Sequence, residues 1–219
     1  MKILIHAVPE RMWYVNEFLI PALQAQGAEE IEIWNDTEHR GNLAACMDAF
    51  AAREGDGGTW HIQDDVLLCR DFVKRCRQHD SGVVYGFCCE QFTDDPRQFG
   101  RVSVEDAWHS FQCVRIPDSW ARDCAAWLEG DGRLHEQYPL WIRSGKMDDS
   151  VFRAYLIAEH GRETVENLRP CLAEHVDWIV GGSVLSPWRG FIARAYWWDD
   201  EDLVRELKAA VRGRVQYVS

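Results

Sequence analysis

Two adjacent carboxylates, Asp64 and Asp65, follow a short segment, Thr59–Ile62, that has the length and composition of a buried strand. In an open parallel sheet this places the pair at the carboxyl end of a strand, where such sheets bind their ligands. Paired carboxylates are hard oxygen donors, and they suit Mg²⁺ or Mn²⁺ carrying the phosphates of a nucleotide. The same residues allow a structural alternative, in which Asp64 caps a following helix and Asp65 lies in its first turn.

Further candidates for chemistry lie in the second half of the sequence. Asp148 and Asp149 open an amphipathic segment, residues 148–160, so their structural alternative is again a helix cap followed by a first-turn acid. His175 ends a segment that begins at Pro170. A neutral imidazole is a reasonable ligand for Mn²⁺, but a lone histidine can equally be a hydrogen-bonded structural residue.

The elements that must position these residues alternate between strands and helices. Short apolar segments predict strands at residues 2–8, 31–34, 59–62, 82–89 and 111–116. Helical spacing of apolar residues predicts helices at residues 10–26, 43–52, 120–128, 148–160 and 201–211, and a loop that runs into a helix at residues 64–79. Residues 90–110 are expected to form an irregular loop or a small insertion. Such alternation is typical of parallel βαβ units in a sheet that helices cover on both faces.

The order of the first predicted elements, a strand, a helix and a second strand, resembles the nucleotide-binding half of GT-A glycosyltransferases. The resemblance rests on the strand at 2–8, the helix at 10–26, and the strand at 31–35 with Asp36 directly after it. Gln63-Asp64-Asp65 resembles the acidic DxD signature of that family, with Gln63 standing where the first aspartate would be. The resemblance covers residues 2–185 in element order, and its motifs are short.

The resemblance implies roles for single residues. Asp65 would bind the metal, Asp64 would bind the donor's ribose or the metal's water, and Pro9 and Asp36 would lie near the nucleobase. As a carboxylate at the surface, Asp65 should contribute little to stability.

In the second half the resemblance implies an inverting transfer. Asp149 aligns best with the family's catalytic base, the residue that takes the acceptor's proton, and Asp148 is the second candidate for this role. The metal would neutralise the leaving diphosphate, with His175 as its third ligand. Gly181-Gly182-Ser183 could face a phosphate, although a plain loop is the preferred interpretation.

Composition limits the class of protein. The chain has 219 residues and a net charge of −12, which disfavours general attraction to nucleic acid or to an anionic membrane. No apolar run approaches the ~20 residues that cross a bilayer. The apolar run at the start of the sequence is too short for the core of a secretory signal. A cytoplasmic protein is therefore expected. There is no GxGxxG, no P-loop and no GxSxG motif.

The cysteines and tryptophans have mainly structural interpretations. Eight scattered cysteines without a CxxC pair are expected to be reduced core residues; Cys69, Cys76 and His79 as zinc ligands are a disfavoured alternative. Most of the 11 tryptophans should be core residues as well. Those that could instead line an acceptor cleft are Trp60, Trp108, Trp141, Trp188, Trp197 and Trp198.

Together these patterns predict one α/β domain over residues 1–219, with a GT-A-like (Rossmann-like), mixed and mainly parallel sheet. Residues 1–90 would bind the nucleotide sugar and residues 91–219 the acceptor. The predicted function is Mn²⁺- or Mg²⁺-dependent transfer of a sugar, from a UDP-sugar first of all, to a hydroxyl of a glycan, protein or small molecule. The alternatives are a nucleotidyltransferase, a metal-dependent phosphoester hydrolase, or a non-catalytic binding protein.

A hydroxymethylated base in phage DNA is a minority acceptor. It is disfavoured by the net charge, although basic residues near the C-terminus could follow phosphates. These are Arg189, Arg194, Arg205, Lys208, Arg212 and Arg214.

Overall fold

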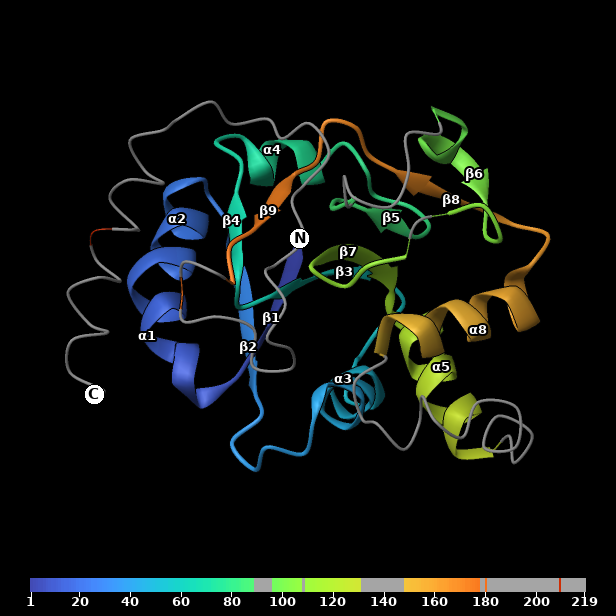
Figure 1. Ribbon diagram of the computed structural model, residues 1–219, viewed down its shortest axis with the longest axis horizontal. Coiled ribbons are helices and arrows are strands. Elements are labelled where there is room, and N and C mark those ends of the chain that lie inside the picture. The colour runs from blue at the N-terminus through green and yellow to red at the C-terminus, as the bar shows by residue number, and fades with distance from the viewer. Residues whose placement is uncertain (89–95, 108, 131–147, 178–179, 181–208, 210–219) are drawn as a thin grey trace.

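The computed structural model describes residues 1–88, 96–107, 109–130, 148–177, 180 and 209. This part has an α/β fold with a seven-stranded mixed sheet of order β2-β1-β3-β7-β5-β8-β6, and a small sheet formed by β4 and β9 (Figure 1). The strands are β1 (Lys2–Ala7), β2 (Glu30–Asn35), β3 (Gly58–Gln63), β4 (Val66–Leu68), β5 (Val84–Tyr85), β6 (Gly100–Ser103), β7 (Cys113–Pro117), β8 (Thr164–Asn167) and β9 (Ala173–His175).

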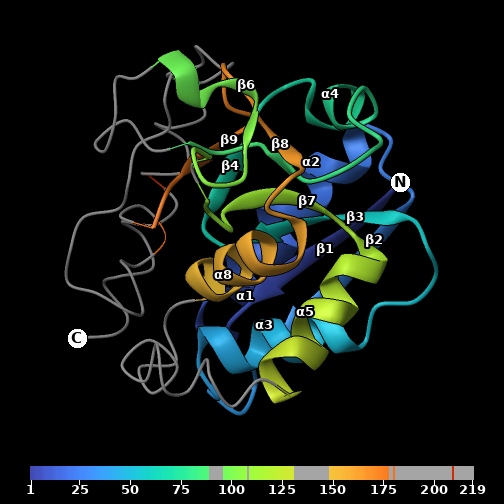
Figure 2. The ribbon, with the colours of Figure 1, turned by 90° about the vertical axis from the view of Figure 1, so that its right-hand side faces the viewer.

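Helices lie on both faces of the large sheet (Figures 1 and 2). They are α1 (Met12–Tyr14), α2 (Ile20–Ala25), α3 (Asn42–Ala51), α4 (Phe72–Cys76), α5 (Asp118–Gly130) and α8 (Asp148–His160), with short 3-10 turns at Pro9–Arg11 and Pro96–Gln98. A π-helical stretch, Val15–Leu19, joins α1 to α2, so residues 9–25 form one continuous helical segment. This confirms the helix expected at residues 10–26.

Two hydrophobic clusters fill the space between the sheet and its helices. Alternation along β1 directs Ile3 and Ile5 to the face covered by α1, α2 and α4. On the other face, Phe50 of α3 and Phe152 of α8 pack around Phe111, with ring centroids 5.4–5.8 Å apart. Both faces of the central strands are therefore buried, which explains why their sequences are apolar.

The order of the strands creates a switch point between β1 and β3. From β1 the chain crosses by α1 and α2 to β2, which pairs with one edge of β1. It then returns by α3, on the opposite face, to β3 on the other edge of β1. Open α/β sheets bind ligands outside the carboxyl ends of the strands at such a point. In this chain those ends are Ala7 and Gln63.

Parallel pairs do not dominate the sheet. β1 pairs in parallel with β2 and β3, and β5 with β8. β7 is antiparallel to both β3 and β5, and β6 is antiparallel to β8. The mixed sheet with helices on both faces is thus confirmed, whereas its parallel character belongs mainly to the first half of the chain. Strands from both sides of residue 90 share this sheet.

Local structure differs from expectation after β3. The loop expected to run into a helix at residues 64–79 contains a strand, β4 at Val66–Leu68, before the helix at Phe72–Cys76. Val66, Leu67 and Leu68 are all buried, and β9 supplies their antiparallel partner. Asp64 therefore caps no helix. The strand expected at 82–89 contains only Val84–Tyr85 as β5, and β6 lies inside the loop expected at 90–110. The expected helix at 201–211 lies outside the described residues, apart from residue 209.

Close packing beside β5 predicts an effect of Gly86→Ala. A Cβ at residue 86 would lie 2.7 Å from Cys113 Sγ and 3.3 Å from the Trp60 ring, both in the core. We expect the free energy of unfolding, measured by urea denaturation, to fall by about 1–3 kcal/mol, as for other overpacked cores. Gly130→Ala is the matched control: its Cβ would meet nothing within 4 Å, so stability should stay the same or rise. Equal losses in both variants would contradict the packing explanation.

Candidate active site

Asp64 and Asp65 lie in the turn between β3 and β4, beside the switch point. Both are buried, with 4% and 6% of their surface exposed. The Val8 N–H donates to Asp64 Oδ2 at 2.8 Å, and the Asp64 N–H donates to the His6 carbonyl at 3.0 Å. These bonds join the ends of β1 and β3, so the acidic pair is built into the edge of the sheet.

Arg11 bridges the two carboxylates. Its Nη1 donates to Asp64 Oδ1 at 2.7 Å and to Asp65 Oδ2 at 2.5 Å. On the other side of the pair, His175 Nε2 lies 3.2 Å from Asp65 Oδ2. The prediction that Asp64, Asp65, Asp149 and His175 converge at one end of the sheet holds for Asp64, Asp65 and His175. Among the described residues, no hydrogen bond or ion pair joins Asp149 to this group. Arg11 is an additional member that the sequence analysis missed. A signal was available, because Arg11 is the only lysine or arginine between Lys2 and Arg40.

The β4–β9 pairing brings His175 to the pair. Val66 and His175 are partners in the register of these strands, and the Val176 N–H donates to the Asp65 carbonyl at 2.7 Å. The Tyr14 hydroxyl donates to the Val66 carbonyl at 2.8 Å, which attaches the helical segment after β1 to the same turn. Three segments distant in sequence are thus held together by hydrogen bonds to the main-chain carbonyls of this turn.

Burial and charge act in opposite directions on the ionisable groups. Burial raises the pKa of Asp64 to about 7, against the attraction of Arg11. Burial also favours neutral Asp65, but His175 and Arg11 outweigh it and hold the pKa of Asp65 below its usual value. The pKa of His175 is raised, because the attraction of Asp65 outweighs burial. Burial lowers the pKa of the neighbouring His6 to about 4.

The two residues expected near a nucleobase lie at the ends of adjacent strands. Pro9 begins the 3-10 turn that contains Arg11, directly after Val8. Asp36 follows β2, and its N–H donates to the Ala7 carbonyl at 2.9 Å. The Asp36 carboxylate accepts the N–H groups of Arg40 and Gly41, at 3.0 and 3.1 Å, so it also shapes the loop that leads into α3.

Asp148 and Asp149 are the first two residues of α8, at the same end of the sheet. Asp148 accepts a hydrogen bond from Asn42, the first residue of α3, and only 3% of its surface is exposed. α8 packs with α3 on the face opposite the helical segment that carries Arg11 (Figure 2). Within the described part of the chain, no hydrogen bond or ion pair joins either aspartate to Asp65. Their position in a first helical turn also fits the structural alternative.

The described residues do not fit a divalent cation as they are arranged. Two carboxylates and an imidazole are chemically suitable donors for Mn²⁺. The position between the carboxylates, however, is taken by the Arg11 guanidinium. Among the described residues, no three His, Cys, Asp or Glu side chains are grouped so that they could hold a metal ion. The Mn²⁺ or Mg²⁺ expected from the sequence stays a prediction.

Several other expectations can be placed. The seven cysteines within the described ranges are free and buried, as expected of reduced core residues. His79 pairs with Glu166 at 3.0 Å. Trp60 belongs to the core, with 1% exposed, and lines no acceptor cleft. Other members of these sets lie outside the described residues: Cys89, Trp108, Trp141, Gly181-Gly182-Ser183, Trp188, Trp197, Trp198 and the basic residues 189–214.

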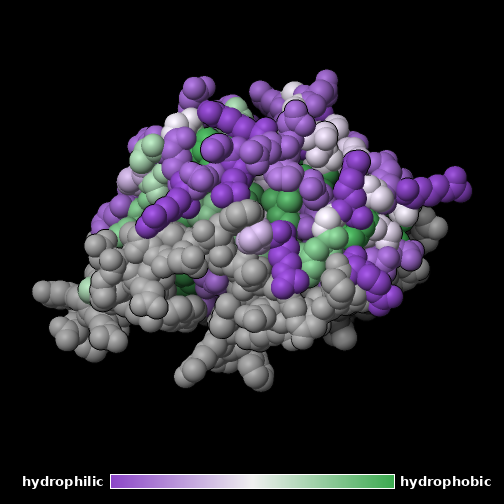
Figure 3. Space-filling view, turned by 90° about the horizontal axis from the view of Figure 1, so that it is seen from above, coloured by the Kyte–Doolittle hydropathy of each residue, from purple (hydrophilic) through white to green (hydrophobic). Residues whose placement is uncertain are grey.

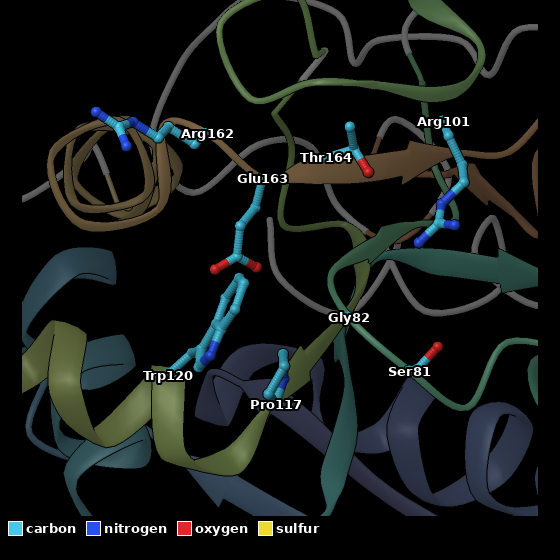
Figure 4. A pocket seen from close by; sticks show the side chains of 8 residues that line it. All are labelled: Ser81, Gly82, Arg101, Pro117, Trp120, Arg162, Glu163 and Thr164. Atoms are coloured by element: carbon cyan, nitrogen blue, oxygen red, sulfur yellow. The ribbon is translucent and has the colours of Figure 1, made fainter.

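A depression of about 550 Å³ lies elsewhere on the molecule (Figure 4). Its lining includes Trp120 and Glu163, and both of these side chains contact His160. It also includes Pro117, which pairs with Gly58 at the start of β3, so the depression is at the opposite end of the sheet from Asp64. It is therefore separate from the candidate active site.

On the face seen from above, the described surface is mainly hydrophilic, with hydrophobic residues between the hydrophilic ones (Figure 3). No helix in the described ranges is long and apolar enough to cross a membrane.

Comparisons with known proteins find distant structural likeness only. No protein-family model matches the chain, and no curated protein sequence matches it. TarS 1–349 from S. aureus matches with a TM-score of 0.46 and 9% identity, over 82% of this chain and 62% of that one. A putative glucose-1-phosphate thymidylyltransferase from Bacillus anthracis matches with a TM-score of 0.42 and 10% identity, over 97% and 95%. The inositol-1-phosphate CTP transferase from T. maritima matches with a TM-score of 0.38 and 12% identity, over 96% of this chain and 76% of that one.

This chain thus spans less than two thirds of the TarS structure. At these identities and TM-scores the matches say nothing about function, which has to be inferred from the site itself.

Proposed function

We propose that the chain is a glycosyltransferase that binds a nucleotide-diphosphate sugar, a UDP-sugar first of all, at the carboxyl ends of β1 and β3. The observation that supports this best is the position of the cluster formed by Arg11, Asp64, Asp65 and His175. It lies at the switch point of an open α/β sheet, which is where this architecture binds ligands. A structural salt bridge would not need to be at this edge.

In the proposed complex the nucleoside lies across the ends of β1 and β2. Pro9 and Asp36 flank the base, and Asp64 is the nearest carboxylate to the ribose. Arg11 and His175 bring fixed positive charge to the side on which the diphosphate leaves, and such preorganised charge stabilises a leaving group. The contacts of Asp36 with Arg40 and Gly41 keep this edge in shape before the donor arrives.

The proton acceptor in the proposed transfer is Asp149. The acceptor oxygen attacks the anomeric carbon, the bond from this carbon to the diphosphate breaks, and the hydroxyl proton passes to the carboxylate. The nucleotide diphosphate leaves with the electron pair. Burial raises the pKa of Asp149, which makes it a stronger base. Asp148 is less suited, because its buried carboxylate already accepts a hydrogen bond from Asn42 at the start of α3.

The acceptor is proposed to be a hydroxyl of a glycan, a protein or a small molecule, with hydroxymethylated DNA as the minority option. The test is incubation with a panel of nucleotide sugars and acceptors, read by mass spectrometry of all products. We expect release of a nucleoside diphosphate together with an acceptor that is heavier by one sugar. Release of pyrophosphate would instead indicate nucleotidyl transfer. If no donor in the panel is turned over, the proposal is contradicted.

A further inference from the structure

The four oxygens of the acidic pair have little capacity left for another cation. Asp64 Oδ1 accepts from Arg11 and Asp64 Oδ2 from the Val8 N–H. Asp65 Oδ2 is shared by Arg11 and His175. Of these four oxygens, only Asp65 Oδ1 has no hydrogen-bond partner among the described residues, and it is buried. A single free oxygen is less than the one or two available carboxylates through which proteins usually hold Mg²⁺ together with its waters.

Arg11 is a fixed cation and cannot easily leave. A guanidinium stays protonated in proteins, and both of its carboxylate partners are at least as buried as Arg11 itself, which has 7% exposed. The residue sits in the turn that directly follows β1, where its N–H donates to the Val8 carbonyl at 3.0 Å. Val8 also binds Asp64 through its N–H. The same short segment therefore positions the arginine and one of its two carboxylates.

We propose that Arg11 takes the place of a divalent cation between Asp64 and Asp65, so that the acidic pair binds no metal and the donor is held without one. The pair then acts as a positioning device for the Arg11 guanidinium. That the acidic pair binds no metal follows from the ion-pair geometry alone, whereas metal-free binding of the donor rests on the proposed function.

The first experiment uses the wild-type protein and Mn²⁺ alone. Free Mn²⁺ is followed by electron paramagnetic resonance during a titration to about 1 mM, the weak end of protein sites for hard divalent cations. We expect the acidic pair to bind no Mn²⁺, so the signal of free Mn²⁺ should show no saturable loss that disappears when Asp65 is replaced by Asn. One equivalent bound by the wild type and lost in Asp65→Asn would overturn the inference.

A pair of variants then identifies Arg11 as the cause. Arg11→Met keeps the length of the side chain but removes its charge, and should create a Mn²⁺ site within the same concentration range. The control is Arg53→Met, because Arg53 is also buried, with 3% exposed, and pairs with Asp118 at 3.3 Å near the other end of the sheet. It should create no such site. A folded Arg11→Met protein that still binds no Mn²⁺ would contradict the role given to Arg11. If Arg11→Met does not fold, the wild-type titration still decides.

Titration with a nucleotide can test this inference separately from the proposed function. UDP is titrated into the wild type by calorimetry, once with EDTA and once with Mn²⁺, and we expect the same affinity in both. UDP binding that requires Mn²⁺ would overturn the inference and leave the proposed function standing. No binding of any nucleoside diphosphate in either buffer would remove the proposed function and the statement about the donor, while the Mn²⁺ titration would still decide whether Arg11 replaces the metal.

Discussion

Asp65→Ala is expected to lower the free energy of unfolding by about 3–5 kcal/mol, the usual cost of removing one partner of a buried ion pair. The carboxylate is 6% exposed and contacts both Arg11 and His175. Its removal takes one of the two carboxylates, Asp64 and Asp65, from Arg11 and deprives His175 of the charge that contributes most to raising its pKa. Chemical denaturation monitored by circular dichroism measures the effect.

The control for this prediction is Asp56→Ala. Asp56 also pairs with an arginine, Arg122, at 3.6 Å, but its side chain is 98% exposed, so its loss should not change stability measurably. The sequence alone suggested a small effect, because Asp65 was expected to be a surface carboxylate; its burial contradicts that premise. Equal stability of Asp65→Ala and the wild type would contradict the buried ion pair.

Asp149→Asn is expected to reduce turnover by about 10²-fold or more and to leave the affinity for the donor near that of the wild type. A general base takes the acceptor's proton only as the new bond forms, so it contributes to the transition state and little to ground-state binding. Steady-state kinetics with a verified donor and acceptor, together with calorimetry of donor binding, measure the two quantities separately.

Asp148→Asn serves as the comparison for Asp149. Its carboxylate is buried and accepts from Asn42, so its replacement should affect turnover less than that of Asp149. Equal loss of donor affinity and rate in Asp149→Asn would make Asp149 a donor ligand instead of a base. Full activity in both variants would exclude the inverting scheme, and a retaining transfer would become the next hypothesis.

The first half of the fold could be predicted from local patterns. Apolar strands alternate with amphipathic helices up to β3, and each of these elements is long enough for its periodicity to show. The order of parallel βαβ units then places Asp64 and Asp65 at the carboxyl edge. The direction of β7 could not be predicted in this way, because a strand of the same composition can pair in either direction.

The composition of the cluster depends on contacts between distant residues, which local patterns do not contain. β4 and β9 have three residues each, and they pair only because both are buried beside the turn at Asp64 and Asp65. Arg11 lies 53 residues before Asp64 in the sequence, in a turn with no periodicity of its own. The burial of the acidic pair, and with it the arginine in the position expected for a metal, became visible only in three dimensions.

Calorimetric titration of UDP into the wild type and into Asp64→Asn tests the central claim most directly. Asp64 contacts both Val8 at the end of β1 and Arg11, so a ligand that binds across β1 and β3 must respond to this change. We predict saturable binding to the wild type, at least about tenfold weaker binding to folded Asp64→Asn, and wild-type binding to Gly130→Ala. Binding of UDP that is the same in all three proteins would place the nucleotide elsewhere and contradict the proposed active site.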